Sequence, residues 1–123
     1  DLAASQASAL LAETPETNGR KIIARTFSGR DLAYLKLLAQ KLTRQSSSAI
    51  VLLASESPQP ALVFAQSVGQ PHDMAALLKQ TVSSLGGRGG GSKDLAQGGV
   101  PQSTNLAAAL TSAAQSLSSH HED

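Results

Sequence analysis

The chain has 123 residues and a formal net charge of +1 at pH 7. This length favours one compact domain over two, and the small charge means that any anionic partner must be held by a local patch rather than by the overall field. The sequence contains no cysteine, which excludes disulfides, thiolate metal sites and cysteine nucleophiles.

Only Phe27, Tyr34 and Phe64 are aromatic, so we expect an aliphatic core built from leucine, isoleucine, valine and alanine. No apolar run approaches the roughly 18 residues that a membrane span needs, and the first residues lack the basic and apolar regions of a signal peptide. We therefore expect no membrane partner and a cytoplasmic location.

Residues 2–13, 20–27 and 32–44 are expected to form a helix, a strand and a second helix. Apolar residues recur every three or four positions in both helical segments, and the segment between them has the β-branched content and bounded length of a strand. Asp31 supplies a cap for the second helix. We interpret the polar side of that helix as a solvated face, and it carries Lys36, Gln40, Lys41 and Arg44.

The first helical pattern begins abruptly at Asp1. We interpret it as the end of a helix that belongs to a longer protein and that packs on a neighbour or on a second copy. An ordinary first helix is the equal alternative.

The remaining segments predict two more strands and two more helices. Residues 49–55 form an apolar run suited to a strand buried on both faces, and residues 61–65 look like its hairpin partner. Asp73 can cap a helix that runs to about Leu85, and helical spacing predicts a last helix over residues 106–117. The order of elements predicts an α/β fold in which a small mixed sheet packs with helices, preceded by the end of a connecting helix.

The most informative segment is a glycine-rich run at residues 86–99, which holds seven of the ten glycines. Glycine costs roughly 1 kcal/mol relative to alanine inside a regular element, so we expect a cluster only where backbone turns tightly or closely approaches another group. Arg88 and Lys93 add positive charge. The pattern predicts a glycine-rich loop, with room for a short strand, that seats phosphate or another anion. A flexible linker is the alternative.

The sequence offers no convincing catalytic constellation. Its nine acidic residues are scattered, and no carboxylate pair emerges for acid–base chemistry. Ser92, Lys93 and Asp94 are adjacent on the chain, and adjacent side chains cannot be presumed to meet. The phosphate-loop pattern of nucleotide hydrolases is absent. His72 is expected to be a surface or capping group, because no second metal ligand lies at a helical spacing from it.

The run at residues 86–99, GGRGGGSKDLAQGG, resembles the glycine-rich signature of the DHH-associated domain, in the form that closes alanyl-tRNA synthetases and long-form alanyl-tRNA editing proteins. Ser92 and Lys93 stand where that signature commonly has Arg-Pro, which keeps a cation and loses a rigid proline. The resemblance covers roughly residues 13–118. It divides the chain into the end of an upstream connecting helix (1–14), the glycine-rich domain (15–119) and a disordered tail (120–123).

The resemblance implies a noncatalytic C-terminal module that contacts alanine-specific tRNA through the phosphate backbone of the RNA. It favours an editing protein as the parent, which would hydrolyse mischarged alanyl-tRNA. A synthetase C-terminal domain and a dimerisation or assembly module without RNA contact are the alternatives, and a homodimer through the upstream helix is a further expectation.

The resemblance also implies where any cofactor would lie. Zinc in this family belongs to a separate editing domain with an HxxxH pair and a Cys-x-x-x-His motif, and neither occurs here, so we expect no cofactor in this chain. The expected nucleic-acid-binding residues are Gly86, Gly87, Arg88, Gly89, Gly90, Gly91, Ser92, Lys93, Gln97, Gly98 and Gly99.

Overall fold

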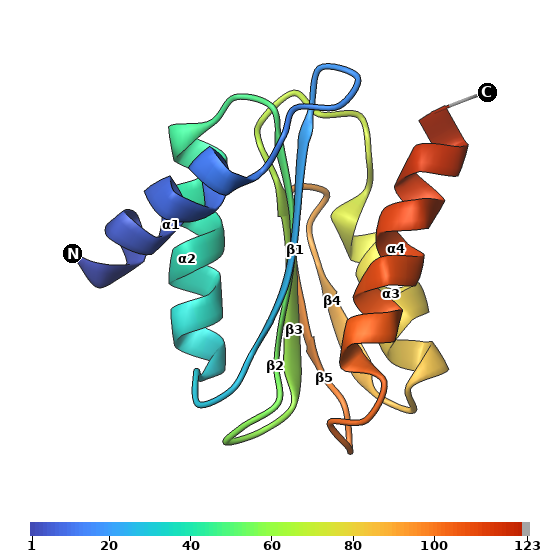
Figure 1. Ribbon diagram of the computed structural model, residues 1–123. Helices are drawn as coiled ribbons and strands as arrows, with labels where there is room; N and C mark the ends of the chain where they lie inside the picture. The colour runs from blue at the N-terminus through green and yellow to red at the C-terminus, as the bar shows by residue number, and fades with distance from the viewer. Residues whose placement is uncertain (122–123) are drawn as a thin grey trace.

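One five-stranded sheet lies between two pairs of helices (Figure 1). The computed structural model describes residues 1–121, with side chains described through residue 117. The elements in chain order are α1 (Leu2–Glu13), β1 (Lys21–Phe27), α2 (Leu32–Gln45), β2 (Ala49–Ser55), β3 (Ala61–Gln66), α3 (Met74–Ser84), β4 (Arg88–Gly91), β5 (Leu95–Gly99) and α4 (Leu106–His121). The predicted α/β class with a small mixed sheet is confirmed.

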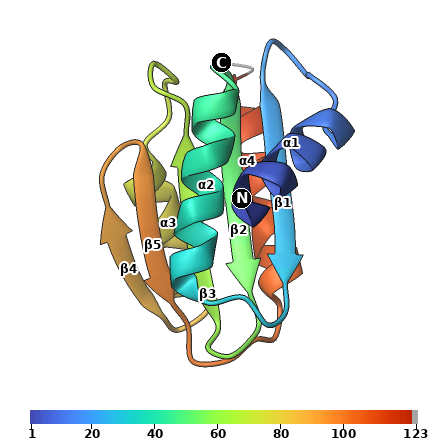
Figure 2. The same ribbon diagram turned by 90° about the vertical axis from the view of Figure 1, so that its left-hand side faces the viewer.

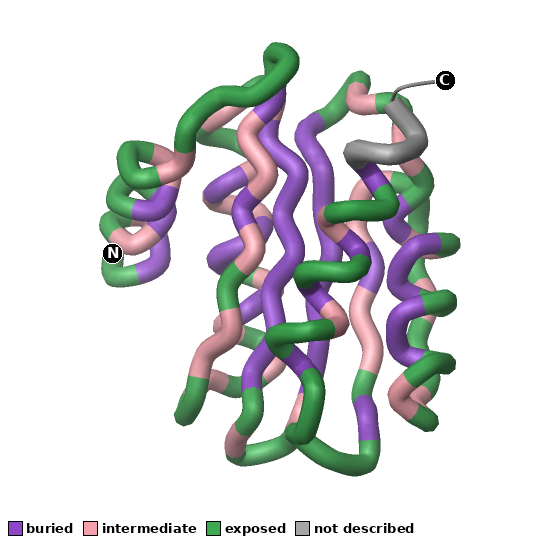
Figure 3. The backbone as a smooth tube through the Cα atoms, turned by 45° about the vertical axis from the view of Figure 1, so that its right-hand side comes forward, coloured by how far each residue is buried: buried purple, intermediate pink, exposed green. Residues whose placement is uncertain are grey.

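The strands follow the order β1-β2-β3-β5-β4 across the sheet. The β1–β2 pair is parallel, and the other three pairs are antiparallel. Every residue of β2 and β3 is buried, because helices cover both faces of the sheet at its centre. This burial explains the continuous apolar runs of these two strands, and Figure 3 shows the buried backbone gathered inside the sandwich.

Alternate side chains of the central strands enter two separate apolar layers. Helices α1 and α2 cover one face of the sheet, and the layer beneath them includes Ile23, Leu35, Leu38, Leu42, Val51, Leu53 and Val63. Helices α3 and α4 cover the other face, where the layer includes Ile50, Leu52, Leu62, Phe64, Met74, Leu78, Leu106 and Leu110. Both layers are mainly aliphatic, with Phe64 fully buried in the second.

The helix caps follow the sequence prediction. Asp31 Oδ1 accepts the Tyr34 N–H at 2.9 Å at the start of α2, and Asp73 Oδ1 accepts the Ala76 N–H at 3.2 Å at the start of α3. These bonds satisfy amide groups that a helix start leaves unpaired. The buried side of α3 is formed by Met74, Leu77, Leu78, Thr81 and Val82, and the Thr81 hydroxyl donates to the Leu77 carbonyl at 2.8 Å.

Helix α1 packs on the outside of α2. Its buried side is made of Ala3, Ala7 and Leu10, and Lys41 of α2 pairs with the carboxylate of Asp1 at 3.4 Å. Among the described residues, no helix has the length and apolar character that crossing a bilayer requires. The tail predicted over residues 120–123 lies at the end of α4 and in part outside the described residues, so it stays a prediction.

The glycine-rich run differs from the loop that its composition predicts, because it forms the two-stranded hairpin β4–β5 at one edge of the sheet. Glycine disfavours strands through its conformational entropy, but here the missing side chains let the hairpin approach α3. A Cβ at Gly89 would lie 2.8 Å from Leu78 Cδ2, and one at Gly98 would lie 3.1 Å from Val82 Cγ1. Close packing therefore selects glycine in these strands.

The buried amide of Gln66 joins the hairpin turn to the rest of the domain. Its Nε2, which carries two N–H groups, lies 2.6 Å from the carbonyl oxygen of His72, 3.0 Å from Asp94 Oδ1 and 3.2 Å from the carbonyl oxygen of Lys93, so that one N–H is shared between two of these acceptors. No sequence pattern singled out Gln66, which directly follows the strand predicted over residues 61–65. Its three bonds connect β3, the segment before α3 and the turn between β4 and β5.

Replacing Gly89 with alanine is expected to lower the free energy of unfolding by about 1–3 kcal/mol, because the new Cβ would overlap the hairpin backbone as well as Leu78. Gly99→Ala is the matched control, since the nearest atom to its new Cβ is 3.8 Å away. Urea unfolding followed by circular dichroism measures both variants. Equal stability of the two would contradict the packing explanation.

Gln66→Ala is expected to lower the free energy of unfolding by about 1–3 kcal/mol, because it leaves three acceptors without this donor. Gln80→Ala removes an amide from an exposed position of α3 and serves as the control. Thermal unfolding of the two variants under identical conditions measures the difference. A Gln66→Ala protein as stable as Gln80→Ala would show that this network does not hold the hairpin turn.

Candidate nucleic-acid interface

The β4–β5 hairpin extends the sheet beyond the helix that covers its neighbours. On one face α2 lies over β2 and β3, while α3 packs against β4 and β5 from the other face. Figure 2 shows that, on the α2 side, β5 and β4 lie beside the helix rather than under it. We call this exposed side of the hairpin the open face and define it by Arg88, Gln97 and Gly99.

The open face borders a hollow of about 670 Å³. Residues 31–33 at the start of α2 form one wall, residues 58–61 between β2 and β3 form another, and the hairpin forms the third. Five of the expected binding residues line it, and they are Arg88, Gly89, Gln97, Gly98 and Gly99. Segments far apart in the sequence thus meet around one concavity.

Among the residues that the structure describes, Arg88 is the only cation that lines this hollow. Its side chain is exposed, and within the described part of the chain its guanidinium has no hydrogen bond or ion pair. Asp31 is the only acid that lines the hollow, and one of its carboxylate oxygens already caps α2. The guanidinium of Arg88 is therefore available to an anion, while the opposite wall carries negative charge.

Lys93, the second cation expected in the anion seat, lies at the other end of the hairpin. It follows Arg88 by five positions along the chain, a distance on the order of 15 Å at the rise of a strand. Its ammonium donates to the Gln70 carbonyl at 2.6 Å and lies 3.8 Å from Asp94 Oδ1. The structure does not bring Lys93 and Arg88 together, and Lys93 ties the hairpin turn to the segment before α3.

Backbone conformation or close packing within the fold explains why most of the expected binding positions are glycine. Gly86 has a φ of +79° and ends α3, and a Cβ at Gly87 would lie 2.2 Å from the Gly99 carbonyl oxygen. A Cβ at Gly91, where φ is +157°, would lie 2.4 Å from the Leu95 carbonyl oxygen. At these positions, as at Gly89 and Gly98, the fold itself accounts for glycine, and no bound ligand is needed to explain it. Gly90, which lies in the edge strand β4, and Gly99, which lies in β5, have more space for a Cβ.

A cation that the sequence analysis missed lies along this edge. A Cβ at Gly90 would be 3.3 Å from Lys79 Cε, so the side chain of Lys79 runs from α3 to the outer strand. Within the described residues its ammonium has no partner. No local signal could identify it, because its proximity to β4 depends on the packing of α3 against the hairpin.

Ser92, Lys93 and Asp94, which are adjacent on the chain, do not form a nucleophile with its activating partners. Ser92 Oγ donates to the Leu95 carbonyl and accepts the Leu95 N–H, each at 3.3 Å, so this hydroxyl closes the hairpin turn. Over the part of the chain that the structure describes, no group of three or more histidine or acidic side chains could hold a metal ion. His72 Nε2 is in contact with Nη1 of the buried Arg20.

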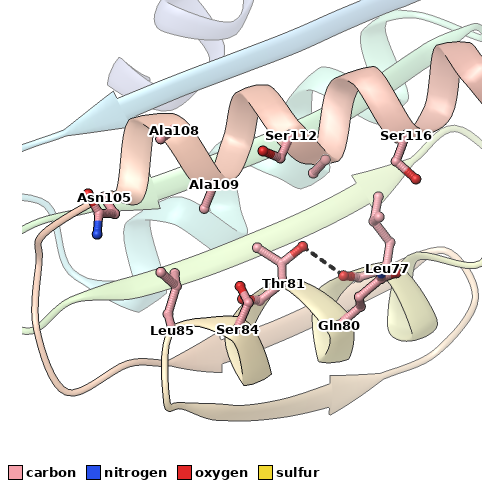
Figure 4. A pocket seen from close by; sticks show the side chains of 11 residues that line it. Leu77, Gln80, Thr81, Ser84, Leu85, Asn105, Ala108, Ala109, Ser112 and Ser116 are labelled. Carbon is pink, nitrogen blue, oxygen red and sulfur yellow. Dashed lines mark hydrogen bonds between the residues drawn. The ribbon is translucent and has the colours of Figure 1, made fainter.

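A second hollow, of about 350 Å³, lies between α3 and α4 (Figure 4). Its walls carry small or uncharged side chains, including Thr81 and Ser84 from α3 and Ser112 and Ser116 from α4. Thr81 turns its hydroxyl back to its own helix. Among the described residues, no charged side chain lines this hollow.

Comparison with known proteins identifies relatives over most of the chain. The DHHA1 domain matches residues 18–119. An alanine–tRNA ligase from Aromatoleum aromaticum is 35% identical over 117 residues, and one from Leptothrix cholodnii is 34% identical over 114 residues. Each alignment covers 90% of this chain and 13% of the ligase. The chain thus spans only a small part of the length of these relatives.

A solved structure has the same fold. The C-Ala domain of alanyl-tRNA synthetase from Aquifex aeolicus matches with a TM-score of 0.67 and 23% identity, covering 80% of this chain and 94% of that one. This match supports the arrangement of helices and sheet described above. Together with the domain match over residues 18–119, it confirms the resemblance first indicated by the glycine-rich run: the chain belongs to the DHHA1 domain family.

Proposed function

We propose that this chain is a noncatalytic C-terminal module of an alanine–tRNA ligase and that it contacts tRNA through the open face of its hairpin. The relatives named above are alanine–tRNA ligases, which supports a ligase parent over the editing protein that the sequence analysis favoured. A cytoplasmic location goes with that parent. The observation that carries the RNA contact is the unpaired guanidinium of Arg88 beside exposed glycine backbone.

Phosphate contacts would supply most of the affinity. Arg88 and Lys79 lie on or beside the glycine hairpin, and β4 is an edge strand whose outer side has no neighbouring strand in the sheet. Guanidinium, ammonium and backbone N–H groups are the donors that proteins use for phosphate oxygens. Phe64 is fully buried, so it offers no surface on which a base could stack. Such an interface positions RNA and depends strongly on salt.

The assembly alternative has less support from the packing. The glycines that exclude a side chain do so because of their own hairpin and α3, so their occurrence needs no second copy. Helix α1 buries its apolar side against α2 through Ala3, Ala7 and Leu10. Leu2 is exposed and remains available to a partner. The expected homodimer through an upstream helix stays a prediction.

Arg88→Ala is expected to weaken binding of labelled alanine tRNA and to reduce the slope of log affinity against log salt by about one phosphate contact. Arg44→Ala makes the same charge change at an exposed position in the last turn of α2, remote from the hollow. Fluorescence anisotropy at several salt concentrations measures both variants, with a noncognate tRNA in parallel.

The unmodified chain is expected to lose affinity severalfold for each doubling of salt if about four phosphates are neutralised. Equal losses for Arg88→Ala and Arg44→Ala would place the contact elsewhere. Binding that does not change with salt would contradict the phosphate-contact proposal. Absence of tRNA binding, with self-association in sedimentation that persists in Arg88→Ala, would favour the assembly alternative.

A further inference from the structure

The hollow beside Arg88 has properties that phosphate binding alone does not explain. Its volume, about 670 Å³, falls within the roughly 300–1,000 Å³ typical of sites that enclose small molecules. A phosphate group needs only a shallow contact with cations and backbone amides. The size of the hollow therefore suits a larger group attached to the phosphate that Arg88 would hold.

The chemistry of the walls differs from one side to the other. Arg88 lies on the hairpin side, whereas Asp31 lies on the α2 side, where a phosphate would be repelled. Leu32, on the same wall as Asp31, and Pro58 and Pro60, on the wall between β2 and β3, provide apolar surface. An occupant that matches this arrangement has an anionic part near Arg88 and an uncharged, flat part with polar edges between the apolar walls.

Gln97 supplies a polar side chain on the hairpin wall of the hollow. It lies on β5, lines the hollow, and its side-chain amide has no hydrogen-bond partner among the described residues. An amide both donates and accepts, which is the pairing that the edge of a nucleobase offers. The free carboxylate oxygen of Asp31 can accept from an amino or imino group of the same base.

We propose that this hollow holds one unpaired nucleotide of RNA, with the base between Leu32 and the two prolines, its edge on Gln97, and its phosphate on Arg88. This inference rests on the proposed RNA contact and adds a preference for RNA with an accessible unpaired base over a fully paired duplex. Phosphate contacts at the edge strand position the RNA, and the hollow selects the exposed base.

Ala33→Leu provides a test, because Ala33 is an exposed helical residue that lines the hollow and leucine suits a helix. The larger side chain would fill the hollow without changing charge. Ala107→Leu makes the same change at an exposed position of α4, which does not contact the hollow, and serves as the control. Gln97→Ala is a second variant that removes the proposed base contact and no internal hydrogen bond.

The binding measurement uses two RNAs with equal numbers of phosphates, a hairpin with an unpaired loop and a blunt duplex. The unmodified chain should bind the RNA hairpin more tightly than the RNA duplex. Ala33→Leu and Gln97→Ala should each weaken binding of the RNA hairpin by about fivefold, the lower end expected for one held base, and Ala33→Leu should leave duplex binding unchanged. Ala107→Leu should bind both RNAs as the unmodified chain does, and circular dichroism verifies folding.

The outcomes separate this inference from the proposed function. If the unmodified chain binds both RNAs equally and the variants change nothing, the hollow holds no base and RNA contact through phosphates still stands. If no RNA binds, both proposals are wrong. If nucleoside monophosphates bind as tightly as the hairpin and Ala33→Leu abolishes that binding, the hollow belongs to a free nucleotide and the RNA assignment is overturned.

Discussion

The close packing of the glycine hairpin, on itself and on α3, is the constraint on which the rest of this structure depends. At Gly87 and Gly91 a side chain would overlap the neighbouring strand of the hairpin, and at Gly89 and Gly98 it would also press on Leu78 and Val82 of α3. Hairpin and helix can approach this closely only without those side chains. Two further strands are thereby added to the sheet beyond β3.

This extension creates the candidate site. Helix α2 is placed by its apolar side over β2 and β3, and the sheet continues past it as β5 and β4. The side of the hairpin that α3 does not cover remains open, and Arg88 lies there with no internal partner among the described residues. Tight packing on one side of the hairpin and an accessible cation on the other are thus consequences of one arrangement.

Local sequence patterns were sufficient for most of the elements. The alternation of helical and strand-like segments, the caps at Asp31 and Asp73 and the buried central strands depend on neighbouring residues, and each was predicted correctly. The hairpin was predicted as a loop with room for a short strand, because glycine has low intrinsic strand preference, and contact with α3 reverses that preference. Propensity gave no information about this tertiary contact.

The site could be predicted only in part, because its geometry is not local. Arg88 was identified from its position in the glycine-rich run. Lys93 lies apart from it at the hairpin turn, where its ammonium donates to the Gln70 carbonyl and pairs with the Asp94 carboxylate. Lys79 reaches β4 only through helix packing. The hollow joins the start of α2, the β2–β3 connection and the end of the hairpin, which no sequence spacing relates.

The most direct test of the account is backbone amide NMR of this chain during titration with alanine tRNA. The account predicts that the amides whose signals shift or broaden gather at Arg88, Gln97 and Gly99 and at the start of α2, and that they recover as salt is raised. Changes confined to α1, or to the groove between α3 and α4, with the hairpin unaffected, would contradict the open face as the RNA-binding surface.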